Sequence, residues 1–560
     1  MHNAKSIMQP FWLFFWSCTL MLGWLLPNHY RPWLAFHSDA WIGIALLLAA
    51  FAICFRSKRE IFFYRMEVLA LALIGLVWVQ HFLGLIPFAG VAWISSIYLF
   101  GFAAAMVAGA SWERASPNQF ADALFLAIGA AAIFSVGIEL YQWFQLDGLA
   151  LWIMDGGENR PHANLGQANQ LATFLIWGLL AIGWGATRRF VGVRVGVLMS
   201  AYLLFGIALT GSRAAWIGIL LVVAAAWFWR SLCPWEKMPM TVTALAGYFV
   251  LCILGIGWSQ SNWATDLGNR MTIGLRPIAW KAFLDAASRH PWAGYGWNQT
   301  ASAQMEVAAD HPYIPGVFSY AHNLFLDLVL WCGIPVGLLV SCFLLRWLWV
   351  QFRKVDSVRD ALLFLFVLVI ANHAMLENPL YFGYFLLPTG MVIGVMNVRA
   401  GMKPFFVLGR WSFALMVTIA ASVLTLLIRD YAQVEETYGI TRLQWEHIQV
   451  KPPEPLDVIF LTQWEDFFDY AKSESRPGLG EDELAWRRNV TNLFPGPLFF
   501  YKLASAQALN GHPQDAELSL RRMCKFVSEP DQLTVKDMWA KQAKENKEIS
   551  VVMWPKDVCP

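Results

Sequence analysis

Apolar stretches long enough to cross a bilayer recur about thirteen times along this chain. They lie roughly at 10–26, 41–55, 67–83, 91–110, 120–141, 169–187, 193–209, 214–229, 241–259, 322–344, 359–376, 382–398 and 411–428. Hydrophobic residues make up 58% of the 560 residues and charged residues only 14%, which is more apolar surface than a soluble fold can bury. The sequence therefore predicts an all-α, polytopic membrane helix bundle.

Lys and Arg residues indicate which side of the membrane each gap faces. They gather in every second gap, beginning with Lys5, and the short gaps in between hold only Arg31, Arg160 and Arg213. The positive-inside rule places the Lys- and Arg-rich gaps in the cytoplasm. The N-terminus is then cytoplasmic, and no small-residue cleavage site follows the first stretch, so we expect an uncleaved span. An odd number of spans places the C-terminal region outside, which for a bacterial inner-membrane protein is the periplasm.

Three regions are predicted to lie outside the lipid on this outer side, at 142–168, 260–321 and 429–560. We therefore expect a transmembrane domain over residues 1–428, which includes the long loop 260–321, and a small helical C-terminal domain over 429–560. The net charge of +2 gives no indication of a nucleic-acid partner.

Two segments of these outer regions have helical patterns. Residues 276–289 place Ile278, Phe283 and Ala286 or Ala287 on one side at helical spacing, which predicts an amphipathic helix that ends at His290-Pro291. Residues 499–527 predict two amphipathic helices joined at NGHPQD, with Ala504, Ala506 and Ala508 on the close-packed face. This pair resembles one helix-turn-helix unit of a tetratricopeptide repeat.

Two cysteines, Cys524 and Cys559, fall in the predicted outer domain, where a disulfide can persist. The sequence leaves open whether they form a disulfide or remain free thiols. The spacing of Cys and His residues gives no indication of a zinc site.

Two arginines on the predicted outer side, Arg213 and Arg276, are candidates for binding an anion. Arg213, in TGSRAAWIG, sits at the end of an apolar span, where a cation either snorkels to the interface or binds an anion such as a lipid phosphate. Arg276 stands at the head of the predicted loop helix, where backbone N–H groups also favour an anion. A surface role is the plain alternative for each arginine taken alone.

His322 lies where the long loop re-enters the membrane, in SYAHNLFLDLVLW. It is either structural or the group that takes a proton from a hydroxyl near neutral pH. Glu377, Tyr381 and Tyr384 fall at a short outer turn, in ENPLYFGYFLLP. There they either form an interfacial aromatic belt with one solvated carboxylate, or they orient sugar hydroxyls or hold a protonated histidine.

Several strings resemble one known family. RPHANLGQANQLATFL at 160–175 and PNHYRPWLAFHSDAW at 27–41 are similar to the pilin-type protein O-oligosaccharyltransferases of the PglL group. The segment 276–299 and AHNLFLDLVLWCGIPVGLL at 321–339 resemble the broader superfamily of O-antigen ligases and polymerases. ENPLYFGYFLLP is similar to the PglL branch, and the resemblance covers roughly residues 10–400.

The resemblance implies a glycosyltransferase-C-like membrane enzyme. It would transfer a glycan from undecaprenyl diphosphate to a Ser or Thr hydroxyl of a pilin-like periplasmic protein, by inverting transfer without metal or other cofactor. His322 would be the catalytic histidine, and Arg213 and Arg276 would hold the diphosphate. Gln167, Glu377 and Tyr381 or Tyr384 would position sugar or acceptor.

Alternatives to protein glycosylation remain open at this stage. An O-antigen ligase would use lipid A-core as acceptor, and an O-antigen polymerase would extend the glycan, both with the same chemistry. A transporter of the lipid-linked glycan is disfavoured, because the chain has no internal repeat or pair of interrupted spans of the kind transporters show. The sequence does not identify the glycan, the acceptor's target sequence or the oligomeric state.

Overall fold

The computed structural model describes residues 2–56, 60–156, 160–233, 235–259 and 275–559, so the first part of the predicted outer loop lies outside the described residues. The chain divides into two compact units. Unit 1 comprises residues 1–74, 97–272 and 345–453. Unit 2 comprises residues 75–96, 273–344 and 454–560.

Unit 1 is built almost entirely from helices, together with one two-stranded sheet. Its elements are α1 (His2–Leu25), α2 (Phe36–Arg56), β1 (Glu60–Phe63), α5 (Gln119–Trp143), η1 (Ala163–Leu165), α6 (Ala168–Thr187), α7 (Val193–Leu209), α8 (Arg213–Phe228), η2 (Arg230–Leu232), α9 (Met238–Ser259), α14 (Val358–Ala374), η4 (Pro379–Tyr381), α15 (Gly383–Arg399), β2 (Phe406–Gly409) and α16 (Arg410–Trp445). Strands β1 and β2 pair antiparallel, with Glu60 opposite Gly409 and Phe63 opposite Phe406.

Unit 2 contains the loop helices and the C-terminal helices. Its elements are α11 (Arg276–Arg289), α12 (Thr300–Val307), η3 (Ala308–Asp310), α17 (Gln463–Lys472), α18 (Glu481–Leu493), α19 (Pro497–Leu509), α20 (Pro513–Cys524), α21 (Glu529–Glu545) and α22 (Lys547–Ser550). Three further helices have residues in both units: α3 (Arg65–Phe82), α4 (Ala89–Ala115) and α13 (Leu324–Arg353).

The helices confirm a multi-pass membrane protein. Among the described residues, eight helices are long and apolar enough to cross a membrane, namely α2, α3, α4, α5, α6, α9, α13 and α16. The other predicted spans coincide with shorter helices: the apolar part of α1, and α7, α8, α14 and α15. The exact number of spans stays a prediction.

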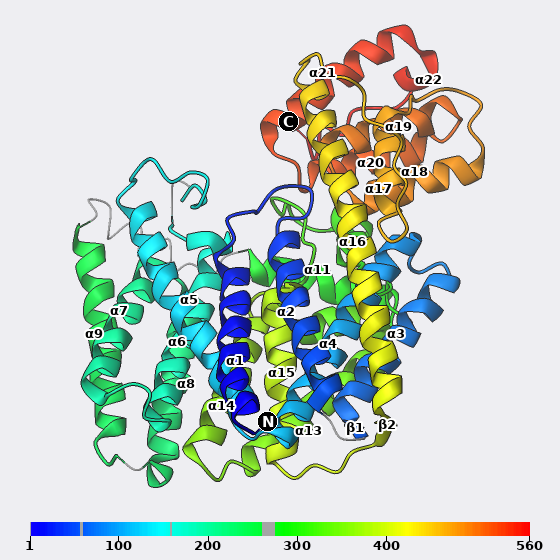
Figure 1. Ribbon diagram of the computed structural model, residues 1–560. Coiled ribbons are helices and arrows are strands. Elements are labelled where there is room, and N and C mark those ends of the chain that lie inside the picture. Colours follow the sequence, from blue (N-terminus) through cyan, green and yellow to red (C-terminus); the bar gives the residue numbers. More distant parts are fainter. Residues whose placement is uncertain (1, 57–59, 157–159, 234, 260–274, 560) are drawn as a thin grey trace. The chain divides into compact units, whose positions relative to one another are not determined.

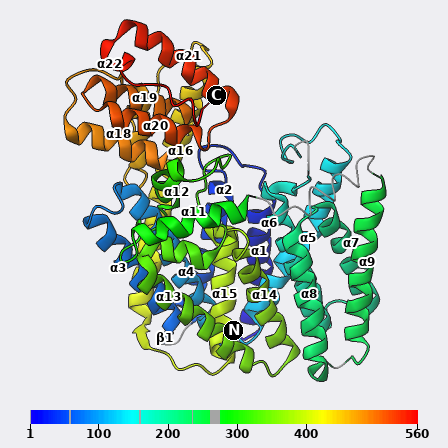
Figure 2. The same cartoon turned by 180° about the vertical axis from the view of Figure 1, so that it is seen from behind.

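Helix α6 lies at the centre of the helix packing in unit 1, against α5, α7, α8 and α14. Figures 1 and 2 both show α7, α8 and α9 as neighbouring helices. Trp177 of α6 is fully buried, stacks on Phe366 of α14 at 3.8 Å between ring centroids, and donates its indole N–H to the carbonyl of Phe366 at 3.0 Å. This buried contact holds α6 against α14. These two helices carry most of the polar cluster of unit 1 that is described below.

Glycines allow α4 and α15 to approach closely. A Cβ atom on Gly109 would lie 2.0 Å from the carbonyl oxygen of Met391, and one on Gly394 would lie 2.0 Å from that of Met106. Small residues on facing helices allow the close backbone contact that is typical of helix–helix packing in membranes. This packing holds α15 in place, and with it the turn that precedes it.

The C-terminal helices confirm the predicted pair, because α19 and α20 pack as a hairpin joined at residues 510–512. Ala504, Ala508, Ala516 and Leu520 form one buried cluster with Trp539 of α21. Cys524 and Cys559 form a disulfide, which settles the choice that the sequence left open. The tetratricopeptide-like character and the boundary at residue 428 stay predictions; α16 continues through that boundary to Trp445.

The amphipathic helix of the loop is confirmed as α11, but one residue of its predicted buried face is wrong. Ala279, Ala282, Phe283, Ala286 and Ala287 are buried, whereas the Ile278 side chain remains 40% exposed. The alanines allow α11 to pack closely against α12, which lies beside it in Figure 2. The buried stripe therefore keeps Phe283, Ala286 and Ala287 and includes Ala279 in place of Ile278.

Candidate active site

The first candidate polar cluster is in unit 1 and centres on the Glu377 carboxylate. Glu377 lies in the turn between α14 and α15 and is buried. Gln167 donates its amide N–H to Glu377 Oε2 at 2.9 Å, and Asn169 donates to Oε1 at 2.5 Å. Two amides from the start of α6 therefore hold one carboxylate, so the interpretation of Glu377 as a solvated interfacial residue is wrong.

A buried histidine completes the surroundings of this carboxylate. His373, on the last turn of α14, is 1% exposed, and its Nε2 lies 3.5 Å from Glu377 Oε2. Its Nδ1 lies 2.9 Å from the hydroxyl of Thr173. Hydrogen bonds on both ring nitrogens fix the orientation of the imidazole, which in turn restricts the carboxylate beside it.

Arg160 links this cluster to the turn that carries Arg213. Its Nε donates to the carbonyl of Thr210 at 2.6 Å, and its Nη2 donates to Asn169 Oδ1 at 3.1 Å. On the other side of Arg213, Asn372 donates its amide to the carbonyl of Ala214 at 3.5 Å. The backbone on both sides of Arg213 is therefore tied to residues of the cluster.

Arg213 and Arg276 share one local geometry, because each is the first residue of a helix. Arg213 begins α8, and its side chain is exposed. Within the described residues, the N-cap residue Ser212 makes no side-chain hydrogen bond to α8, and Leu275 before α11 has no side-chain acceptor to offer. The positive end of the helix dipole stands beside each guanidinium, a combination that suits an anion.

The turn that leads into Gln167 contacts α5 and His29. Gln142 of α5 accepts hydrogen bonds from the backbone N–H groups of His162 and Ala163 at 3.0 and 2.8 Å. Gly166 has a φ of 74°, and a Cβ atom there would lie 3.3 Å from Nδ1 of His29, so glycine suits both the backbone and the close contact. Burial lowers the pKa of His29 from 6.5 to about 4, although a hydrogen bond with the Asn164 backbone opposes the shift.

The two candidate tyrosines have different environments. Tyr381 is 38% exposed, whereas Tyr384 is fully buried and donates its hydroxyl to Gln170 of α6. The backbone N–H of Tyr384 donates to Asp39 Oδ1 at 3.0 Å, and its carbonyl accepts from the indole of Trp24 at 3.0 Å. Tyr384 therefore anchors the start of α15, and Tyr381 is the tyrosine that a ligand can reach.

The second cluster is in unit 2 and holds Arg276 and His322. Trp280, one turn after Arg276 on α11, donates its indole N–H to the carbonyl of Ala321 at 2.8 Å. Residues four apart on a helix lie on the same face, so Arg276 projects from the face of α11 that carries this hydrogen bond. This hydrogen bond therefore joins the helix that carries Arg276 to the turn that carries His322.

His322 adopts a left-handed backbone conformation with a φ of 55°. This turn is fixed on both sides, because Ala321 donates its N–H to Asp327 Oδ1 at 2.7 Å and Asn323 Oδ1 accepts from the N–H groups of Phe325 and Leu326 at 3.1 and 3.2 Å. The imidazole packs between aromatic rings, 5.2 Å from Phe318 and 4.6 Å from Tyr320 between centroids.

The structure thus groups the predicted residues into two sets. Gln167, Arg213, Glu377, Tyr381 and Tyr384 belong to unit 1, whereas Arg276 and His322 belong to unit 2. Their convergence on one substrate stays a prediction. Among the described residues, no three His, Cys, Asp or Glu side chains gather so that they could hold a metal ion. The expectation of a metal-free reaction therefore remains to be tested.

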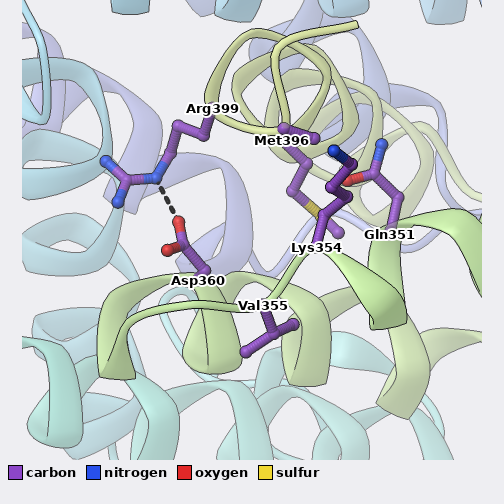
Figure 3. Close-up of a pocket in the computed structure, with 7 residues that line it drawn as sticks. Gln351, Lys354, Val355, Asp360, Met396 and Arg399 are labelled. Atoms are coloured by element: carbon purple, nitrogen blue, oxygen red, sulfur yellow. Dashed lines mark hydrogen bonds and ion pairs between the residues drawn. The ribbon is translucent and has the colours of Figure 1, made fainter. Parts of the chain in front are cut away.

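A different polar group lies at the opposite ends of α14 and α15 from the Glu377 turn. There Arg399 forms ion pairs with Asp360 and with Glu113. Figure 3 shows Arg399 directed at Asp360, in a small pocket also lined by Lys354 and Met396. Two carboxylates neutralise the guanidinium of Arg399. We therefore interpret these ion pairs as structural contacts that hold the helices together at their predicted cytoplasmic ends.

Comparison with known families matches three successive parts of the chain. Residues 161–184 match a family described as a protein glycosylation ligase. Residues 198–341, which include Arg213, Arg276 and His322, match the O-antigen ligase family. Residues 361–539 match the C-terminal part of a virulence factor membrane-bound polymerase.

Two curated proteins of Acinetobacter baylyi are similar to this chain. A general O-oligosaccharyltransferase is 29% identical over 412 residues, which cover 71% of each chain. A ComP-specific O-oligosaccharyltransferase is 31% identical over 252 residues, which cover 43% of this chain and 44% of the relative. These matches and relatives support a membrane glycosyltransferase of the PglL-type branch of the O-antigen ligase superfamily.

Sequence reasoning missed several residues of the cluster in unit 1. Arg160 and Asn169 stood inside the string that carried the resemblance, yet only Gln167 was assigned a role from it. His373 precedes Glu377 by four residues, the helical spacing that brings two side chains together. That spacing was a usable signal for His373, whereas nothing local in the sequence indicated the contact between Arg160 and Thr210.

Proposed function

We propose that this glycosyltransferase moves an oligosaccharide from undecaprenyl diphosphate to a Ser or Thr hydroxyl of an exported, pilin-like protein, on the periplasmic side of the bacterial inner membrane. The hydrogen bond from Trp280 to Ala321 carries the proposal, because it joins the helix of Arg276 to the turn of His322. The similarity to two protein O-oligosaccharyltransferases supports a protein as acceptor.

The reaction is a single displacement with inversion. The acceptor oxygen forms a bond to the anomeric carbon while the bond from that carbon to the diphosphate oxygen breaks, and its electron pair leaves with the diphosphate. His322 accepts the proton of the attacking hydroxyl. Arg213 and Arg276, each at a helix N-terminus, stabilise the negative charge of the leaving diphosphate. Gln167, Glu377 and Tyr381 position sugar or acceptor, and Tyr384 supports them through its buried contacts.

Two guanidinium groups and two helix N-termini supply the positive charge that other glycosyltransferases take from a divalent cation. We therefore expect transfer to continue in EDTA. A strict requirement for a divalent ion would contradict this part of the proposal.

Reconstitution tests the function directly. The purified full-length protein in lipid vesicles is given glycan on undecaprenyl diphosphate and, in parallel, an exported pilin, lipid A-core or no acceptor. Glycan on the pilin supports the proposal. Glycan on lipid A-core identifies a ligase, which the match of residues 198–341 to the O-antigen ligase family keeps as the second candidate. Extension of the lipid-linked glycan without acceptor identifies a polymerase.

A further inference from the structure

The segment that leads to His322 is bound along one edge by the C-terminal region. Ile314 donates its backbone N–H to the carbonyl of Lys525 at 2.9 Å, and Gly316 donates to the carbonyl of Phe526 at 2.9 Å. The Lys525 ammonium donates to the carbonyl of His311 at 2.9 Å. Three hydrogen bonds therefore attach residues 311–316 to the turn after α20.

Gln304 of α12 binds the same segment from another side. Its side chain is buried, donates its amide N–H to the carbonyl of Gly316 at 3.1 Å, and accepts the backbone N–H of Phe318 at 2.7 Å. Phe318 then contacts the imidazole of His322, edge to face, at 5.2 Å between centroids. Gln304 thus connects the segment held by Lys525 to the ring that packs on His322.

The turn at Lys525 is itself fixed by an apolar core and a covalent bond. Met523, Cys524 and Phe526 are buried together with Met305 of α12, and Val317 packs against them. The disulfide to Cys559 directly precedes Lys525. The turn at Lys525 therefore shares a core with α12, through Met305, and with the segment before His322, through Val317.

We propose that the C-terminal region positions the catalytic histidine, with Lys525 and Gln304 as the positioning residues; the inference rests on the proposed function for the role of His322. Neither residue needs to touch the substrate. The hydrogen bonds to His311, Gly316 and Phe318 hold the backbone from which the imidazole extends. A shift of about 1 Å at a catalytic group costs about a hundredfold in rate, so loss of this support should lower turnover.

The test compares Lys525→Met, which keeps the aliphatic stem, with Lys525→Arg, which keeps a donor. Lys541→Met, at an exposed position on α21, is the matched control. In the reconstituted full-length protein we expect kcat of Lys525→Met to fall about tenfold or more, with KM for the lipid-linked donor unchanged within about twofold. We expect Lys525→Arg to recover most of the turnover, and the control to behave as wild type.

Hydrogen exchange provides a readout that does not depend on activity. The backbone amides of residues 311–322 should exchange faster in Lys525→Met than in wild type and in the control. Unchanged exchange together with unchanged kcat overturns the inference, and so does a rise in KM for the donor with unchanged kcat. If Lys525→Met fails to insert, Gln304→Glu, which keeps an acceptor for Phe318, takes its place with the same criteria.

Failure of the proposed function gives a different result. If the wild-type protein transfers no glycan while Lys525→Met still raises the exchange of residues 311–322, the contact is real but the role of His322 is wrong. If the wild type transfers glycan and Lys525→Met does so equally well with unchanged exchange, the positioning role alone is wrong.

Discussion

The indole N–H of Trp280 donates a hydrogen bond to the backbone carbonyl of Ala321, at 2.8 Å. Trp280 follows Arg276 by one helical turn, and Ala321 directly precedes His322. Trp280→Phe keeps the ring but removes the donor, which costs about 0.5–1.5 kcal/mol for a hydrogen bond of this kind. We expect kcat for glycan transfer to fall about tenfold, measured with lipid-linked donor. Trp292→Phe, on a side chain that is 79% exposed, should leave the rate unchanged; an equal loss in both variants would contradict the coupling.

His322→Ala tests the base. Removal of a general base typically costs about 10²–10⁴ in rate, so we expect transfer to fall to that extent while the protein remains inserted and folded. The measurement is turnover of the purified protein, with the thermal unfolding midpoint as the folding check. His447→Ala, on an exposed turn, is the matched control. Near-normal turnover of His322→Ala would remove the assignment.

Arg213→Lys and Arg276→Lys keep the charge but lose the planar fork that grips two phosphate oxygens. We expect each substitution to weaken use of the lipid-linked donor about tenfold or more in kcat/KM, with little change in stability. Arg31→Lys, at an exposed arginine of the predicted outer side, should have no effect. Full activity of both lysine variants would show that the arginines do not bind the diphosphate through paired contacts.

Glu377→Gln tests the cluster in unit 1. A glutamine side chain replaces one acceptor oxygen with an NH₂ group, which must then face the amide of Gln167 or Asn169. A buried donor without an acceptor costs about 1–3 kcal/mol, so we expect a lower unfolding midpoint together with reduced transfer. Glu436→Gln, at an exposed position on α16, is the control and should match wild type. A midpoint equal to wild type would show that the amides do not depend on this carboxylate.

The lowered pKa of His29 leads us to expect that the stability of the protein depends on pH. Its pKa is lowered from 6.5 to about 4, chiefly by burial, with repulsion from His162 and His37 adding to the shift. Between these two pH values the unfolded chain binds a proton at His29 that the folded protein does not, so this contribution is complete above pH 6.5 and is lost as the pH falls toward 4. We expect the unfolding midpoint to drop less on acidification in His29→Gln than in wild type. His447→Gln should keep the wild-type drop, and identical curves for all three proteins would contradict the prediction.

The periodicity of apolar residues was sufficient to predict the helices of the bundle, because each predicted span overlaps one helix and extends past its ends by at most two residues. Side-chain direction was harder to predict. On α11 the pattern did not distinguish Ile278, which remains exposed, from Ala279, which packs against a neighbour, because which alanine face is buried depends on the partner helix.

The sequence pointed to Gln167 and Glu377 of the cluster in unit 1, but not to the connections within it. Gln167 and Glu377 are separated by 210 residues in sequence, and no spacing rule indicates that one donates to the other. The same holds for Arg160 and Thr210. Tyr381 and Tyr384 looked equivalent in the sequence, and only burial distinguished them. Contacts between distant segments depend on how the helices pack, which local sequence does not encode.

Glu377 also decides which end of the Gln167 amide remains for a ligand. Since the NH₂ group is directed to the carboxylate, the carbonyl oxygen is the end that can meet a substrate. An amide oxygen accepts a hydrogen bond from a sugar hydroxyl or an acetamido N–H, and it repels a phosphate oxygen. Under the proposed function, the carbohydrate of the lipid-linked donor would therefore face the amide of Gln167, and its diphosphate would face the guanidinium groups.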